Sequence, residues 1–338
     1  MKRRTLIKQF AALSISLTGA TTAAQAFVPV GPEEPGTSTV GKAEEIAPGV
    51  FFLKGKTRYF ENGNYQEVEC NNGWIIFDDF VLLVDANFPG SGPAILREIR
   101  KTTNKPIRFV FNTHHHSDHL YGNSFWMKEG ATPLAHAGVM EEIRKYETGF
   151  FGGAPGRWEQ ALKRRTDLAD WPLLPPVLTF SDTMVIEDKH RRVELIHPGA
   201  GHTRGDGIVW LPQERVLFAG DACLNGPYNL FRDAEVESWT RSLERMAALQ
   251  PKIVVTGHGN LGDGDTPRNQ QHYFQLLLDW VKTARQNGGT FESVRPQLPA
   301  LRQRIAADPA AAVYLIPEPE IASGFSLESH IKRIFETV

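Results

Sequence analysis

The chain has 338 residues, of which 41% are hydrophobic and 22% charged, and its formal net charge is −2. This composition is typical of a folded globular protein, and the length suits one large domain or two small ones. No apolar run reaches the roughly 18 residues that a transmembrane helix requires. The weakly acidic balance and the lack of a basic stripe argue against a nucleic-acid partner.

The first 26 residues have the pattern of an export signal. Four basic residues in MKRRTLIK precede the mildly apolar run AALSISLTGATTA, and Ala24-Gln25-Ala26 places small residues where a signal peptidase cuts. We therefore expect residues 1–26 to be a signal peptide and the mature protein to be exported to the periplasm. The paired arginines favour twin-arginine export, with the general secretory route as the alternative. A retained cationic anchor helix is less well supported, because the Thr, Ser and Gly content disfavours a helix.

Residues 27–45 are rich in Pro, Gly, Thr and Ser and are expected to form a linker. We expect residues 46–288 to form the main domain and residues 289–338 to be a helical appendage of the same domain.

The elements expected in the main domain are short strands with helices between them. The first strands are VFFLKG, then WIIF and FVLLVDA as a hairpin, and the next two are IRFVFNT and TPLAH, with helices near residues 92–103 and over SFWMKEG. The later strands are VLTF, TMVIED, RRVELIHP, IVWLP, RVLFAGD and KIVVTGH, with helices over ESWTRSLERMAAL and HYFQLLLDWVKTARQ. This order predicts two packed sheets with helices on their outer faces.

A cluster of possible metal ligands, NTHHHSDHL, directly follows the strand IRFVFNT. His114 and His116 are two residues apart, so in extended chain their side chains point the same way. A turn after them would present Asp118 and His119 as a second, adjacent group. Imidazole and carboxylate are ligands that Zn²⁺ accepts, so the motif indicates a metal site.

Three more polar residues lie at the ends of apolar strands, each near a glycine. His202 follows RRVELIHP in GAGHTRGD, Asp221 ends RVLFAGD, and His258 ends KIVVTGHG. Each one alone is more often a hydrogen-bonding residue than a ligand. Together with the first cluster they predict a larger metal centre.

HxHxDH followed by HTRGD, FAGD and TGHG resembles the metallo-β-lactamase superfamily in its dinuclear hydrolase form, over about residues 50–260. The resemblance implies an α/β fold, the four-layer αβ/βα sandwich, and two Zn²⁺ ions, with Fe or Mn as alternatives. It assigns His114, His116 and His202 to one ion, Asp118, His119 and His258 to the other, and Asp221 to a bridge between them. Asp206 of HTRGD is a candidate for orienting His202. Five other histidines match no ligand position: His136, His190, His197, His272 and His330.

Two ions about 3.5–4 Å apart would lower the pKa of a bound water from about 15.7 toward 7. The resemblance therefore implies a bridging hydroxide that attacks an activated acyl bond of a small molecule, with Asp118 as the catalytic proton carrier. The bond would belong to a β-lactam, a lactone or a thioester. One subclass of β-lactamases has Cys where this chain has Asp221, and an Asp there is closer to lactonases and to thioesterases of the glyoxalase II kind. Export argues against glutathione thioesters, which are chiefly cytosolic.

Candidate substrate contacts are less well defined. Asn225 and Tyr228 follow Asp221 closely and are possible contacts, although Tyr228 could equally be a packing residue. The segment at residues 149–176 contains Arg157, Lys163, Arg164 and Arg165, and forms either a lid that grips an anionic substrate or a solvated helix.

Three alternatives stay open. A mononuclear-iron oxidoreductase of the same superfamily, similar to a persulfide dioxygenase, would use fewer ligands than the seven found here. A metal-binding accessory protein of periplasmic quinoproteins would have no turnover. Cys70 and Cys223 form either a disulfide in an oxidising compartment or two unrelated buried thiols.

Overall fold

The computed structural model describes residues 40–56, 69–163, 165–317 and 324–338. The expected signal peptide lies outside the described residues, as does most of the expected linker. The described residues form a single compact unit. Its first described strand, β1 (Glu44–Ala47), begins just before the expected start of the main domain at residue 46.

The first half of the chain forms a seven-stranded sheet in which neighbours in sequence are neighbours in space. Its strands β1 to β4 pair antiparallel, whereas β4 to β7 run parallel. The expected hairpin joins β3 to β4. The remaining strands of this sheet are β2 (Val50–Leu53), β3 (Asn72–Ile76), β4 (Val81–Val84), β5 (Ile107–Asn112), β6 (Thr132–His136) and β7 (Leu178–Phe180).

The second half forms a six-stranded sheet in the order β13-β12-β11-β10-β9-β8. Only β11 and β12 pair parallel in it, so their carboxyl ends lie at the same edge. Its strands are β8 (Thr183–Glu187), β9 (Arg192–Ile196), β10 (Ile208–Leu211), β11 (Val216–Gly220), β12 (Ile253–Thr256) and β13 (Gly262–Asp263).

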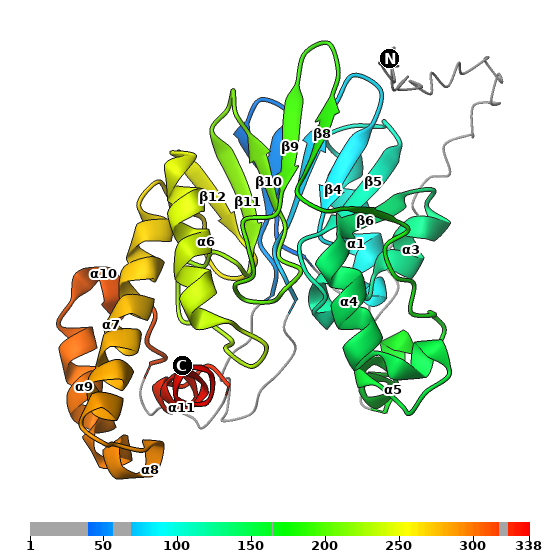
Figure 1. Ribbon diagram of the computed structural model, residues 1–338. Coiled ribbons are helices and arrows are strands. Elements are labelled where there is room, and N and C mark those ends of the chain that lie inside the picture. The colour runs from blue at the N-terminus through cyan, green and yellow to red at the C-terminus, as the bar shows by residue number, and fades with distance from the viewer. Residues whose placement is uncertain (1–39, 57–68, 164, 318–323) are drawn as a thin grey trace, which may run out of the picture. The chain divides into compact units, whose positions relative to one another are not determined.

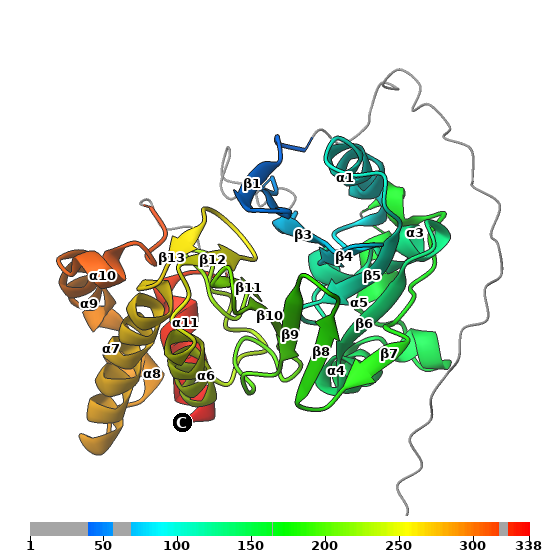
Figure 2. The ribbon, with the colours of Figure 1, turned by 90° about the horizontal axis from the view of Figure 1, so that it is seen from above.

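Helices cover the outer face of each sheet, which gives four layers (Figures 1 and 2). The first sheet carries α1 (Gly92–Arg100), α2 (Ser117–Leu120), α3 (Asn123–Lys128), α4 (Ala137–Tyr146) and α5 (Arg157–Leu162) in its connections. The second carries α6 (Val236–Ala248) and α7 (Thr266–Gln286), followed by α8 (Phe291–Val294), α9 (Leu298–Ala306), α10 (Pro309–Ala312) and α11 (Leu327–Thr337). None of the described helices is long and apolar enough to cross a bilayer.

Apolar side chains fill the space between the sheets and the space under each helical layer. Along β9, Val193 and Leu195 are buried between the sheets while the residues beside them are only half-buried, as the period of two in a strand requires. On α1, Ile95 and Ile99 are four residues apart and pack together on the outer face of the first sheet. These layers confirm the predicted α/β sandwich.

Both cysteines are buried and free, so the disulfide interpretation is wrong and that of two unrelated buried thiols is correct. The Cys70 thiol donates to the carbonyl oxygen of Asp118 at 2.9 Å. Cys223 instead lies in the apolar cluster under α6 and α7. The two side chains serve separate parts of the core.

Candidate metal centre

The ligand motif of the first sheet follows β5, where extended chain changes to helix. His116 is still extended, with φ −64° and ψ 154°, and α2 begins at the next residue. His114 and His116 therefore come from the bend between β5 and α2, and Asp118 and His119 from the first turn of α2. This is the bend that the sequence predicts.

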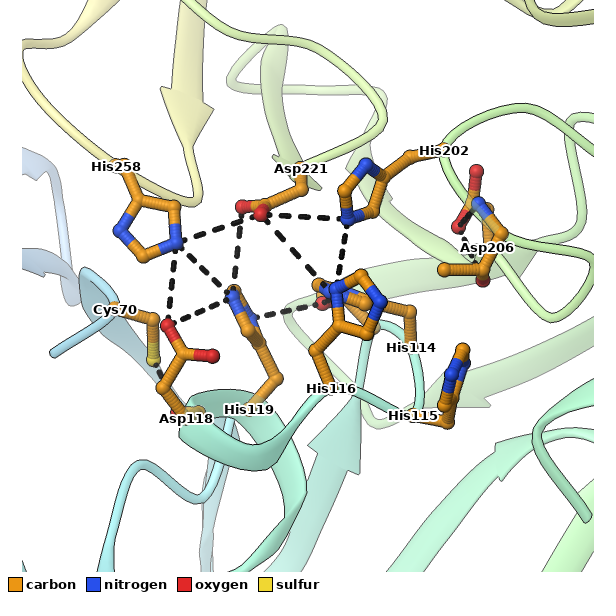
Figure 3. A network of polar contacts seen from close by, with 12 residues as sticks. Cys70, His114, His115, His116, Asp118, His119, His202, Asp206, Asp221 and His258 are labelled. Atoms are coloured by element: carbon orange, nitrogen blue, oxygen red, sulfur yellow. Dashed lines mark hydrogen bonds and ion pairs between the residues drawn. The ribbon is translucent and has the colours of Figure 1, made fainter. Parts of the chain in front are cut away.

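The second sheet supplies the other three residues from the ends of its strands (Figure 3). His202 lies in the loop after β9, Asp221 directly follows β11, and His258 follows β12. Glycine is required beside Asp221, because a Cβ on Gly257 would lie 1.9 Å from Asp221 Oδ1. Gly220 has φ +52°, a conformation that favours glycine.

Four of the seven side chains form the first ligand group: His114, His116, His202 and Asp221. One donor atom from each lies within 4.8 Å of the others. The closest pair is His202 Nε2 and His116 Nδ1 at 2.9 Å. Asp221 Oδ2 is 3.5 Å from His202 Nε2 and 4.0 Å from His114 Nε2.

The second ligand group consists of Asp118, His119 and His258. Asp118 Oδ2 lies 3.2 Å from His258 Nε2 and 3.6 Å from His119 Nε2. Asp221 reaches this group as well, because its Oδ1 is 3.5 Å from His119 Nε2 and its Oδ2 is 3.4 Å from His258 Nε2. The carboxylate of Asp221 thus lies between the two groups.

Burial and charge in this cluster fit divalent cations. All seven side chains are buried, and His114 Nε2 makes no hydrogen bond within the described part of the chain. Burial, followed by the neighbouring histidines, lowers the pKa of His114 well below its usual value, which leaves the neutral imidazole that metals bind. Burial also lowers the pKa of His258, but Asp221 and Asp118 outweigh it and raise that pKa to about 10. A cation in the second group would replace that proton.

Asp85 orients the second group, and we did not single it out from the sequence. Its Oδ2 accepts a hydrogen bond from His119 Nδ1 at 2.8 Å, which directs Nε2 of that ring at the group. Its Oδ1 accepts from the amide and the hydroxyl of Thr113. The sequence does contain a sign of it, since Asp85 directly follows the apolar run FVLLV as Asp221 directly follows RVLFAG.

Asp233 has the same relation to the first group. Its Oδ2 lies 2.9 Å from His116 Nε2, so the other ring nitrogen of His116 faces His202. Asp233 lies in a loop, 117 residues along the chain from His116, and no strand-end pattern marks it.

Asp206 supports the loop of His202 and not its ring. The Asp206 carboxylate accepts from the amide and the hydroxyl of Thr203 at 2.9 and 2.7 Å, and burial raises its pKa to about 8. Among the described residues, His202 Nδ1 has no hydrogen-bond partner. The expected role of Asp206 is therefore corrected: it holds the backbone that carries His202.

The two candidate substrate contacts differ in their environment. Asn225 donates its side-chain amide to the carbonyl of Leu261 at 2.9 Å, so it supports the loop that it belongs to. The half-buried ring of Tyr228 lies 6.4 Å from the ring of His258 and packs against Gly226 and Gly259. Of the two, Tyr228 is the residue beside the metal centre.

The basic residues of the expected lid are mostly engaged in contacts within the chain. Arg157 pairs with Asp233, and Arg165 pairs with Asp167. Lys163 is exposed, and Arg164 lies outside the described residues. The remaining histidines belong to neither ligand group: His136 and His197 stack on each other, His190 and His272 are exposed or nearly so, and His330 is buried under α7.

Comparison with known proteins identifies the family of the chain. Residues 66–258 match the family model of the metallo-beta-lactamase superfamily. A type 2 metallo-beta-lactamase from Pseudomonas aeruginosa is 25% identical over 227 residues, which cover 66% of this chain and 79% of that protein. Another, from Bacillus sp. (strain 170), is 26% identical over 272 residues, or 78% of this chain and 95% of that protein. The alpha subunit of a 2,4-dinitroanisole O-demethylase from Nocardioides sp. (strain JS1661) is 27% identical over 54% of this chain and half of its own length.

Solved structures show the same fold. A metallo-beta-lactamase from Pontibacter korlensis superposes with a TM-score of 0.56 at 19% identity, covering 70% of this chain and 99% of the other. The enzyme FIM-1 from Pseudomonas aeruginosa, in a mono-zinc form, gives 0.55 at 20% identity over 71% and 97%. The chain belongs to the metallo-beta-lactamase superfamily.

Proposed function

We propose that this protein is an exported hydrolase that uses two divalent cations, Zn²⁺ in the first place, to cleave an activated acyl bond of a small molecule. A β-lactam, a lactone or a thioester is the expected substrate. The observation that carries the proposal is the position of Asp221, whose carboxylate lies within 4.0 Å of ring nitrogens from both ligand groups. A single ion would leave one group of buried donors without a cation.

The chain's own residues have distinct tasks in this proposal. Bound cations would supply an activated water molecule and positive charge for the acyl oxygen. Burial raises the pKa of Asp118, but His119 and His258 outweigh it and keep the pKa below its usual value, so Asp118 is an anion. The proposal assigns the transfer of a proton to this carboxylate. The ring of Tyr228, beside His258, offers a half-buried apolar face to the acyl group.

The test combines metal analysis with a substrate panel. Protein purified without added metal should contain two equivalents of a divalent ion and should hydrolyse at least one chromogenic lactam, lactone or thioester. A chelator should abolish the activity, and Zn²⁺ should restore it. Activity that survives complete metal removal would contradict the proposal.

Two other outcomes point to the alternative functions. A single iron per chain together with O₂ consumption would move the protein to the oxidoreductases of the superfamily. Bound metal without turnover on any substrate would favour an accessory role.

Export is the other part of the proposal. It rests on the basic residues of MKRRTLIK at the N-terminus and on the small residues of Ala24-Gln25-Ala26. Mass spectrometry of the protein recovered from the periplasm should find Phe27 at its N-terminus. A protein that keeps Met1 would contradict it.

A further inference from the structure

We propose that Arg157, at the start of α5, is a positioning residue for the first ligand group. It acts through Asp233 on His116. A cation bound in this group and the chain from α4 to α5 (residues 137–162, the α4–α5 segment) therefore stabilise one another. This inference rests on the two-cation centre proposed above. It concerns residues that are far from the ligands in sequence and that no ligand motif contains.

The first step is the contact between Asp233 and His116. A carboxylate can only accept a hydrogen bond here, so His116 Nε2, 2.9 Å from Asp233 Oδ2, carries the proton. The other nitrogen, Nδ1, is then unprotonated and lies 2.9 Å from His202 Nε2 inside the group. Asp233 therefore selects both the tautomer and the orientation in which His116 can bind a metal.

The second step is the bidentate ion pair between Arg157 and Asp233. The Arg157 guanidinium donates two hydrogen bonds to this carboxylate, one of 2.8 Å to Oδ2 and one of 3.0 Å to Oδ1. Such a fork fixes the carboxylate plane as well as its charge. The Asp233 side chain is only 3% exposed, and Arg232 Nε lies farther from it, at 3.4 Å from Oδ2.

The third step connects this ion pair to α4. The guanidinium of Arg157 lies 3.5 Å from the ring centroid of Tyr146, the last residue of α4. The same tyrosine ring stacks on His115, with centroids 5.4 Å apart and planes 13° from parallel. Arg157 Nη1 also lies 3.4 Å from His115 Nε2, so both ends of the connection from α4 to α5 contact the loop that carries the ligands.

Linkage makes the effect reciprocal. If the fork on Asp233 favours the His116 orientation that binds a cation, then a bound cation must favour the docked position of α5 by the same factor. Loss of the two hydrogen bonds from Arg157 to Asp233 should weaken cation binding in the first ligand group. It should also remove the stabilisation of the α4–α5 segment by bound metal.

The test is a Zn²⁺ titration of the full chain against a competing chelator. Two binding steps are expected in this titration. The step that is lost in His258→Ala is the binding of the ion in the second ligand group. Arg157→Gln and Asp233→Asn should weaken the other step by about tenfold or more, in the range usual for residues that orient metal ligands. Arg157→Lys keeps the charge without the fork, so its loss should be smaller, and it covers the case in which Arg157→Gln does not fold.

Two matched variants make the comparison specific. Arg165→Gln removes an arginine that follows α5 and also lies 3.5 Å over an aromatic ring, that of Phe88, and it should leave both steps unchanged. Asp85→Asn changes the carboxylate that orients His119, so it should weaken the second step and spare the first.

A second readout follows the segment itself. Zn²⁺ should slow hydrogen exchange of the amides of residues 147–162 in the wild-type chain but not in Arg157→Gln. If wild-type protein binds Zn²⁺ and these variants bind it equally well, the inference is wrong while the proposed centre stands. If wild-type protein binds no divalent ion, the proposed centre itself fails.

Discussion

At the scale of single residues, Gly257 shows how closely the backbone defines the metal centre. A Cβ at this position would lie 1.9 Å from Asp221 Oδ1 and 2.8 Å from the carbonyl carbon of Gly220. We expect Gly257→Ala to displace the Asp221 carboxylate and to weaken the binding of both ions by about tenfold or more. Chelator competition measures this, and Gly41→Ala is the control, because its added methyl group meets nothing closer than 3.5 Å. Unchanged affinity in Gly257→Ala would show that the carboxylate can move without cost.

Asp221 itself gives the most direct test of the bridge. Since its two oxygens lie near both ligand groups, Asp221→Ala should reduce the metal content at both positions and abolish turnover. Elemental analysis of dialysed protein gives the stoichiometry. His190→Ala, which changes an exposed histidine outside both groups, should retain the wild-type content. A variant at Asp221 that kept two ions would disprove the bridging role.

The residues of the metal centre differ in how far their sequence context predicts them. The seven grouped residues could be predicted because they follow apolar strands, and strand ends that share an edge bring their residues together. Asp85 had the same signal and was overlooked. Asp233 and Arg157 could not be found in this way, because their contact joins two connecting segments 76 residues apart in sequence. The role of Asp206 was misjudged because the sequence shows that it is near His202 but not which atoms it faces.

At the scale of elements, the strands and the long helices follow from apolar periodicity, whereas the connections do not. The position of α11 depends on tertiary contacts: His330 lies 3.0 Å from the Tyr273 hydroxyl of α7 and 2.6 Å from the carbonyl oxygen of Asn229. Its ring also stacks on Phe231. A helix after the end of the family match thereby holds the loop between Asp221 and α6.

His330 makes this contact sensitive to pH. Burial lowers its pKa from 6.5 to about 4, so the folded protein favours the neutral ring. The unfolded chain binds the proton more readily, and stability is therefore lost as pH falls from about 6.5 to about 4, by about 3 kcal/mol in total. The difference in unfolding free energy between the wild type and His330→Gln, measured with urea, should shrink over this range. A difference that does not vary with pH would contradict the assignment, and the exposed-site variant His190→Gln serves as the control.

At the scale of the whole molecule, each ligand group draws on both sheets. His114, His116, Asp118 and His119 come from the first half of the chain, and His202, Asp221 and His258 from the second. A cation bound to the folded protein should therefore stabilise the two sheets together. Zn²⁺ at about 100 times its Kd should raise the unfolding free energy by about 2.7 kcal/mol for each bound ion. Thermal unfolding with and without Zn²⁺ tests this, and Asp221→Ala should lose most of the effect.

The division of ligands between the halves also sets an order of events in maturation. The first sheet ends with β7 at Phe180, so a chain folded only to that point has no histidine or carboxylate from the second half. The first group is complete only once β11 is in place, and the second only once β12 has joined it. A cation in the first group would therefore require a chain folded through to Asp221, and a cation in the second group one folded through to His258.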